Sequence, residues 1–279
     1  MIGRFAPTPS GPLHFGSLCC ALASFLDCRA NQGTWLLRID DIDPPRCVPG
    51  SADEIQKQLQ HFELYWDGDI YWQSQQLHHY EDCVNKLLTD GSAYRCSCNR
   101  KTLQSQGGFE QGYCRAHPPA PHEACALRMD VQGEYHWSDM FLGMQSVNAA
   151  DSPELCLRRR DGLIAYPLAT VLDDISMGIT HVVRGADLLP AASSQLALFA
   201  HFDAPTPSFG HIPIATNPDG NKLSKQNHAE PLTTDNREQQ LRSALHHLGQ
   251  AAAEATGSVD AILRQAIDSW DRNAVPKAI

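Results

Sequence analysis

Short apolar runs alternate with amphipathic segments along most of the chain. Five runs are predicted to be strands: Ile2 to Phe5, Thr34 to Ile39, Leu155 to Arg159, His181 to Arg184 and Phe209 to Ile214. Six segments in which apolar positions recur with helical spacing are predicted to be helices: Ser17 to Ala30, Ala52 to Phe62, Leu77 to Leu88, Tyr166 to Ser176, Ser193 to His201 and Arg237 to Leu248. A parallel sheet with helices on both faces produces this alternation, so we expect an α/β fold with a doubly wound parallel sheet.

The pattern changes between about residues 91 and 150. Gly, His, Pro and Cys gather there and the helical spacing disappears, which indicates a small subdomain inserted between two halves of the fold. We therefore expect residues 1–90 and 151–235 to form the two halves, 91–150 the insertion, and 236–279 a short helical segment. A chain of 279 residues is long enough to bury a substantial core in this arrangement.

The composition excludes several classes of protein. No run approaches the ~18 apolar residues that a membrane helix needs, and the N-terminus lacks a basic region followed by an apolar stretch. We therefore expect a cytoplasmic protein with no membrane association. The sequence contains 10 Cys, and in a reducing compartment we expect most of them to be free thiols. The net charge of −10 is unusual for an RNA-binding protein, but it does not exclude a local basic patch.

The stretch Pro7-Thr8-Pro9-Ser10-Gly11-Pro12-Leu13-His14-Phe15-Gly16 lies between a predicted strand and a predicted helix. A tight turn at this place presents backbone N–H groups and the positive end of a helix dipole, which bind phosphate. His14 precedes the helix and could donate a hydrogen bond to a phosphate oxygen in a transition state. Taken alone, a His before a Gly is more often an ordinary loop residue.

A second stretch, Lys222-Leu223-Ser224-Lys225, follows the turn Asn217-Pro218-Asp219-Gly220. A loop at this position could carry the ammonium group of Lys225 to the same phosphates. Taken alone, the two lysines would be a solvated surface pair. The two stretches together predict a nucleotide-binding site in which His14 and Lys225 are the catalytic residues.

These two stretches resemble the ATP-binding motifs of class I glutamyl-tRNA synthetases. Further matches follow in the family's order over roughly residues 1–250: Arg4-Phe5-Ala6-Pro7-Thr8, Arg38-Ile39-Asp40-Asp41-Ile42-Asp43-Pro44, Gly162-Leu163-Ile164-Ala165-Tyr166 and Val183-Arg184-Gly185-Ala186-Asp187-Leu188. The resemblance implies a Rossmann-like catalytic domain that uses ATP and Mg²⁺ to activate L-glutamate. In many class I enzymes the first of these motifs contains a second His. Ser17 occupies that position here, and a Ser can donate a hydrogen bond but cannot carry charge.

Little chain follows Lys225, so we expect no domain that reads an anticodon. Truncated members of this shape resemble the glutamyl-queuosine tRNA(Asp) synthetases. That resemblance implies a monomer that binds the anticodon arm of tRNA(Asp) and transfers the glutamyl group to its queuosine. Two alternatives remain open: an enzyme that charges a tRNA 3′ end, and a non-catalytic nucleotide- or RNA-binding paralogue, in which His14 or Lys225 would have been replaced.

Three thiols in the insertion, Cys96, Cys98 and Cys114, suit a tetrahedral Zn²⁺ that would order a module too small to fold on its own apolar surface. The alternative is three unconnected thiols. In the related synthetases a Tyr four residues before the last Cys completes the set, and Glu110 occupies that position here. Glu110 is thus the first choice for the fourth ligand, with Tyr113 and His117 as rivals.

Arg4 and Arg184 end two predicted strands, at the sheet edge where open α/β folds bind ligands. A guanidinium is the natural partner of a glutamate carboxylate, although surface ion pairs are the commoner use of an isolated Arg. The resemblance implies that Tyr166 and Arg184 contact the amino acid and that Asp40 replaces a Glu which holds its ammonium. Because Asp is one methylene shorter, the substrate would lie deeper or a water would bridge the gap.

The expected sites are therefore two overlapping sets. The expected nucleotide-binding residues are Pro7, Thr8, Ser10, Gly11, His14, Gly16, Ser17, Lys222, Ser224 and Lys225. The expected amino-acid-binding residues are Arg4, Phe5, Ala6, Pro7, Thr8, Asp40, Tyr166 and Arg184.

Overall fold

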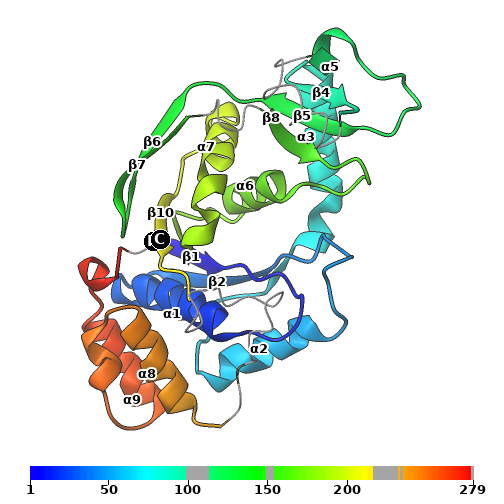
Figure 1. Ribbon diagram of the computed structural model, residues 1–279. Coiled ribbons are helices and arrows are strands. Elements are labelled where there is room, and N and C mark those ends of the chain that lie inside the picture. Colours follow the sequence, from blue (N-terminus) through cyan, green and yellow to red (C-terminus); the bar gives the residue numbers. More distant parts are fainter. Residues whose placement is uncertain (99–112, 149–153, 216–231, 233–234, 278–279) are drawn as a thin grey trace.

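The computed structural model describes residues 1–98, 113–148, 154–215, 232 and 235–277. Its centre is a five-stranded parallel sheet with the strand order β10-β9-β1-β2-β3. The strands are β1 (Ile2–Phe5), β2 (Thr34–Ile39), β3 (Tyr71–Trp72), β9 (His181–Gly185) and β10 (Ser208–Ile212). The expected α/β fold with a parallel sheet is confirmed (Figure 1).

Helices cover both faces of this sheet. The helices of the nucleotide fold are α1 (Phe15–Ala30), α2 (Ser51–His61), α3 (Leu77–Thr89), α6 (Tyr166–Ser176) and α7 (Ala192–His201). Alternate residues of β2 enter different cores: Trp35 and Leu37 pack with α1 and α2, whereas Leu36 packs with α6 and α7. Two-sided burial explains why the strands are continuous apolar runs in the sequence.

Short 3₁₀ helices connect some of these elements. They are η1 (Gln73–Gln76), η3 (Ala186–Ala191), η5 (Ala251–Glu254) and η6 (Arg272–Ala274).

The insertion forms two small antiparallel sheets. The first contains β4 (Ala93–Cys96), β5 (Ala126–Asp130) and β8 (Glu154–Arg158), with the short helix α5 (Tyr113–Ala116) beside β4. The second is a hairpin of β6 (Glu134–Asp139) and β7 (Gly143–Asn148) that runs past α7 to β10 (Figure 1).

One predicted strand lies in a different sheet from the one expected. The run from Leu155 to Arg159 does form a strand, β8, but it pairs antiparallel with β5 and not with the parallel sheet. Leu155 and Leu157 are buried in the same core as α3 and α6. A buried apolar strand has the same sequence pattern in either sheet, so the pattern could not assign its partner.

The C-terminal helices α8 (Arg237–His247) and α9 (Val259–Asp268) pack on α1. The segment after α9 is bound to α1 by the buried carboxylate of Asp27. This carboxylate accepts hydrogen bonds from Nε of Arg272 at 2.6 Å and from the indole N–H of Trp270 at 3.0 Å. Among the helices that the structure describes, none is long and apolar enough to cross a membrane.

Candidate active site

A cavity of about 580 Å³ opens at the carboxyl ends of β1, β9 and β10, beside the start of α1. Many predicted site residues line it: Arg4, Phe5, Ala6, Pro7, Thr8, Ser10, His14, Gly16, Ser17, Tyr166 and Arg184. It is also lined by residues that are not among the predicted site residues: Leu13, Cys20, Arg46, Val183, Gly185, Asp187, Leu188, Pro213, Ile214 and Ala215. The structure therefore brings most of the described members of both predicted sets to one place, whereas Gly11 and Asp40 are not among the lining residues.

The loop between β1 and α1 is held by backbone hydrogen bonds from its neighbours. The N–H of Asp40 donates to the carbonyl of Pro7 at 3.0 Å, and the N–H of Leu13 donates to the side-chain amide oxygen of Gln58 at 2.7 Å. Gly11 has φ = 125°, a conformation that side chains rarely adopt. The conformation of the loop is thus fixed by the residue that follows β2, by a side chain of α2 and by the loop's own glycine.

His14 is the N-cap of α1. Its Nδ1 accepts a hydrogen bond from the backbone N–H of Ser17 at 3.3 Å. Because Nδ1 is the acceptor, the proton of the neutral imidazole lies on Nε2, which is the nitrogen that can donate to a ligand. A Cβ at Gly16 would lie only 3.2 Å from the imidazole, so this glycine gives the ring room against the helix start. The geometry orients His14 as a hydrogen-bond donor.

Arg4 lines the cavity, but its guanidinium is bound to the protein. Nε and Nη2 donate to the two carboxylate oxygens of Asp174, each at 3.2 Å. Asp174 also accepts from Arg38 at 2.6 Å, and Arg38 donates to Asp40 at 2.7 Å. These side chains are buried and form one charged network behind the cavity wall.

Asp40 belongs to this network and is not one of the residues that line the cavity. Burial raises the pKa of its carboxyl to about 6, against the opposing effect of Arg38. The neighbouring Asp173 accepts from Gln73 at 2.6 Å and from the hydroxyl of Tyr80, also at 2.6 Å. Asp173 and Asp174 are not among the predicted site residues, although two adjacent acids within the apolar helix α6 are a detectable signal in the sequence.

Arg184 is held differently. Its Nε donates to Nε2 of His211 at 2.9 Å, its Nη1 donates to Gln195 at 2.5 Å, and its guanidinium lies 4.8 Å from the centre of the Phe209 ring. All of these partners are neutral or aromatic. Nη2 is buried and has no partner among the described residues. Burial lowers the pKa of the Arg184 guanidinium, as expected for a cation without an adjacent counter-charge.

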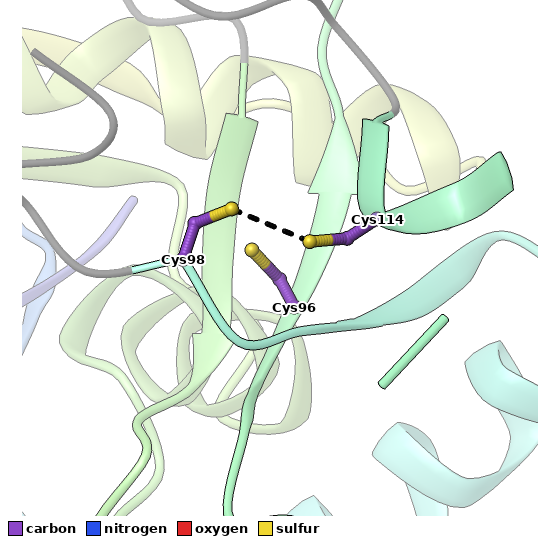
Figure 2. A group of neighbouring side chains, drawn as sticks. All are labelled: Cys96, Cys98 and Cys114. Atoms are coloured by element: carbon purple, nitrogen blue, oxygen red, sulfur yellow. Dashed lines mark hydrogen bonds between the residues drawn. The ribbon is translucent and has the colours of Figure 1, made fainter. Parts of the chain in front are cut away.

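The cysteines of the insertion meet at one point (Figure 2). Cys96 ends β4, Cys98 follows it and Cys114 lies on α5. Their sulfur atoms all lie within 4.8 Å of one another, and those of Cys98 and Cys114 are 3.4 Å apart. Zn–S bonds of about 2.3 Å in a tetrahedron place sulfurs about 3.8 Å apart, so the three thiols fit a zinc ion. Burial raises the pKa of the Cys96 thiol to about 12, whereas at Cys114 the hydrogen bonds from Cys98 and from the backbone of Ser97 outweigh burial and lower the pKa.

Of the three candidates for the fourth zinc ligand, the structure describes the side chain of one, His117. Glu110 and the side chain of Tyr113 lie outside the described residues. His117 is described and exposed, but it is not part of the three-residue cluster. All ten cysteines are free, which confirms the expectation of free thiols.

Lys222, Ser224 and Lys225 also lie outside the described residues. The described chain on either side of them borders the cavity: Ala215 lines it, and the N–H of Leu232 donates to the carbonyl of Leu13 at 2.9 Å.

Known proteins resemble this chain over nearly its whole length. The profile described as tRNA synthetases class I (E and Q), catalytic domain, matches residues 1–248. A relative from Cronobacter sakazakii is 45% identical over 99% of this chain and 94% of its own length. A relative from Vibrio cholerae is 42% identical over 100% of this chain and 93% of its own length. Both carry the name glutamyl-Q tRNA(Asp) synthetase.

The chain belongs to the glutamyl-Q tRNA(Asp) synthetase family. The resemblance predicted from the motifs is confirmed, and the protein is an enzyme of the aminoacyl-tRNA synthetase type, a ligase.

A solved structure agrees with this assignment. The glutamate tRNA ligase from Elizabethkingia meningosepticum, solved in complex with its amino acid, has a TM-score of 0.82 and 26% identity. The match covers 100% of this chain and 66% of the ligase chain. This family member therefore shares the fold of about two-thirds of a glutamate ligase.

Proposed function

We propose that this protein activates L-glutamate with ATP to form glutamyl-adenylate and transfers the glutamyl group to queuosine in the anticodon loop of tRNA(Asp). The observation that carries the proposal is the buried guanidinium of Arg184, whose Nη2 has no partner among the described residues while the side chain lines the cavity. A buried cation in this state favours a carboxylate ligand, because the ligand would supply the missing hydrogen bonds and charge.

The nucleotide would occupy the other side of the same cavity. The start of α1 and the donor nitrogen of His14 suit the triphosphate. The glutamate α-carboxylate would then attack the α-phosphorus, and pyrophosphate would leave as the glutamyl-adenylate forms. Mg²⁺ bound with ATP would supply positive charge for the leaving group. Positioning and charge neutralisation carry this reaction, and His14 and Lys225 are the residues to which we assign them.

The transfer step needs no protein nucleophile, because a hydroxyl of the queuosine ring can attack the glutamyl carbonyl directly. An ester forms, the bond to the phosphate breaks and AMP leaves. The relatives' name supports tRNA as the acceptor, and the hairpin of the insertion contacts β10, whose carboxyl end borders the cavity. A zinc ion held by Cys96, Cys98 and Cys114 would order the insertion and would take no part in the chemistry.

Two measurements test the proposal. Pyrophosphate exchange should depend on glutamate and proceed without tRNA, and exchange that needs tRNA would contradict the activation step. Labelled glutamate should then attach to queuosine-containing tRNA(Asp) and not to the same tRNA lacking queuosine. The 3′-terminal adenosine can be removed from the queuosine-containing tRNA as a control. Label should still attach if the base is the acceptor, and should be lost if the enzyme charges the 3′ end.

A further inference from the structure

The guanidinium of Arg184 is fixed by groups to which the proposed chemistry assigns no role. Nε is bound to His211, Nη1 to Gln195, and the face of the guanidinium lies on the Phe209 ring. These three contacts determine both the rotamer and the plane of the guanidinium. They leave Nη2 as the nitrogen that can meet a ligand.

His211 connects Arg184 to Asp139. Nδ1 of His211 and Oδ2 of Asp139 are 2.5 Å apart, and both side chains are fully buried. Because Nε2 of His211 accepts from Nε of Arg184, the imidazole proton must lie on Nδ1 and be donated to Asp139. The Asp139 carboxylate therefore fixes the tautomer that allows His211 to hold Arg184.

Asp139 also shapes the hairpin to which it belongs. It is the last residue of β6, and its Oδ1 accepts from the backbone N–H groups of Phe141, Leu142 and His211, each at 3.1 Å. The same carboxylate thus caps the turn between β6 and β7 and ties that turn to β10.

The turn lies closely against β10 at a second point. The N–H of Met140 donates to the carbonyl of Phe209 at 2.8 Å. A Cβ at Gly210 would lie 2.7 Å from the Phe141 ring and 2.9 Å from the methyl of Met140. Only a glycine at position 210 permits this approach, so the position of the hairpin relative to Arg184 is set by close packing as well as by hydrogen bonds.

The imidazole between the two charges has a physical consequence. Asp174 binds Arg4 directly and occupies two of its nitrogens, which leaves less of that guanidinium for a ligand. Asp139 instead acts through His211, so its negative charge lies one ring away from Arg184. Arg184 is held firmly but keeps its positive field for a substrate carboxylate.

We propose that Asp139 and His211 are positioning residues that orient Arg184 for the side-chain carboxylate of the substrate, which makes the β6–β7 hairpin of the insertion a structural part of the amino-acid site. The inference rests on the proposed function, in which glutamate is the amino acid activated.

The decisive variant is Asp139→Asn. Its remaining oxygen still accepts from the turn N–H groups, but its amide would face Nδ1 of His211 and force the proton onto Nε2, against the N–H of Arg184. In pyrophosphate exchange we expect the KM for glutamate to rise by about 10- to 100-fold, the loss typical of a hydrogen bond to a charged group, while the KM for ATP stays within about threefold. The melting temperature should fall by no more than the loss of one charge-assisted hydrogen bond requires, because the hydrogen bonds of the turn remain.

Matched variants separate positioning from fold damage. His211→Gln keeps an acceptor for Arg184 and a donor for Asp139, so it should retain a nearly normal KM for glutamate, whereas His211→Leu should resemble Asp139→Asn. Glu134→Gln removes an exposed charge from the same strand and should change nothing. An unchanged KM for glutamate in Asp139→Asn, or equal increases for glutamate and ATP, would overturn the proposal. Wild-type protein without glutamate-dependent exchange would instead refute the proposed function on which it rests.

Discussion

Two buried arginines at neighbouring strand ends of the cavity have opposite surroundings. Arg4, on β1, is bound by Asp174 in a network that also contains Arg38, Asp40 and Asp173. Arg184, on β9, is bound by His211 and Gln195. The first region has three carboxylates for two guanidinium groups. In the second, the hydrogen bonds among the described residues connect the cation to one carboxylate, that of Asp139, and the imidazole of His211 separates the two.

The pKa values of Arg38 in the first region and of Arg184 in the second shift in opposite directions. Burial alone would lower the pKa of the Arg38 guanidinium, but Asp40, Asp174 and Asp173 outweigh it and raise the pKa. Burial lowers the pKa of Arg184, with weaker opposing effects from Tyr166 and the acids. Nη2 of Arg38 also has no partner within the described part of the chain, but the other nitrogens of that guanidinium already donate to two carboxylates. This difference supports the proposal that the β1 region is a scaffold and the β9 region a receptor for an anion.

The largest expected effect comes from breaking the scaffold. Asp174→Ala would leave Arg4 and Arg38 buried with too little counter-charge, which typically costs about 3–5 kcal/mol in the free energy of unfolding. Urea denaturation followed by circular dichroism measures this loss. Asp161→Ala removes an acid of similar type from the exposed pair with Arg159 and should cost less than about 1 kcal/mol. Equal costs for the two variants would contradict the assignment of a scaffold role to the β1 network.

Arg184→Gln should lower activity strongly and stability only slightly, the reverse of Asp174→Ala. Loss of the receptor cation should lower kcat/KM for glutamate by about 10²-fold, as expected when a charge-assisted hydrogen bond to the substrate is removed. The free energy of unfolding should change by no more than about 1 kcal/mol, because the variant removes a buried charge that has no adjacent counter-charge. Exchange kinetics and urea denaturation of the same preparation check both values. A large loss of stability with unchanged kcat/KM would assign Arg184 to the scaffold.

The comparison also shows what the sequence could and could not predict. The bounds of β1 and β2 agree with the predicted strands because Gly, Pro and polar residues border clear apolar runs there. The sequence placed Arg4 and Arg184 at the same sheet edge, but it did not distinguish their roles. That distinction depends on Asp174 and His211, which lie 170 and 27 residues away in the chain.

Local sequence patterns could not predict that the insertion contributes Asp139 to the site. Asp139 and His211 are 72 residues apart, and neither belongs to a recognisable spacing of catalytic residues. Their contact arises because the β6–β7 hairpin returns to β10, and no local signal in the sequence specifies where an inserted hairpin docks. The same limitation led to the wrong sheet for β8.

A pH titration tests the receptor region with a smaller expected effect. Burial lowers the pKa of His211, so the folded protein keeps it neutral while the unfolded chain takes up a proton below about pH 6.5. The stability linked to His211 is therefore present above that pH and is lost as the pH falls. Asp139, which faces the ring, also has a lowered pKa despite its burial, because His211 and the turn N–H groups stabilise its charge. Its contribution is lost only at lower pH.

The measurement is the free energy of unfolding between about pH 7 and 5 for wild type and His211→Gln. The variant should have a flatter curve. His78→Gln is the matched control because its imidazole is 92% exposed, and it should follow the wild type. A wild-type slope that persists in His211→Gln would mean that other groups produce it.

The smallest effect on glutamate activation is expected from a change in the cysteine cluster. This variant distinguishes the cluster from the β6–β7 hairpin, the other part of the insertion. Cys96, Cys98 and Cys114 lie on β4, the chain after it and α5, at the end of the insertion away from β10 (Figure 1). Wild-type protein prepared without chelators should contain about one zinc per chain, and Cys98→Ser should release it. Because the hairpin has its own contacts with β10, glutamate activation should stay within about threefold of wild type, while transfer to tRNA should fall further. Metal analysis, pyrophosphate exchange and tRNA labelling of the same variant test this. Absence of zinc from the wild type would remove the metal site, and a rise in the KM for glutamate as large as that of Asp139→Asn would show that the hairpin depends on the cluster for its position.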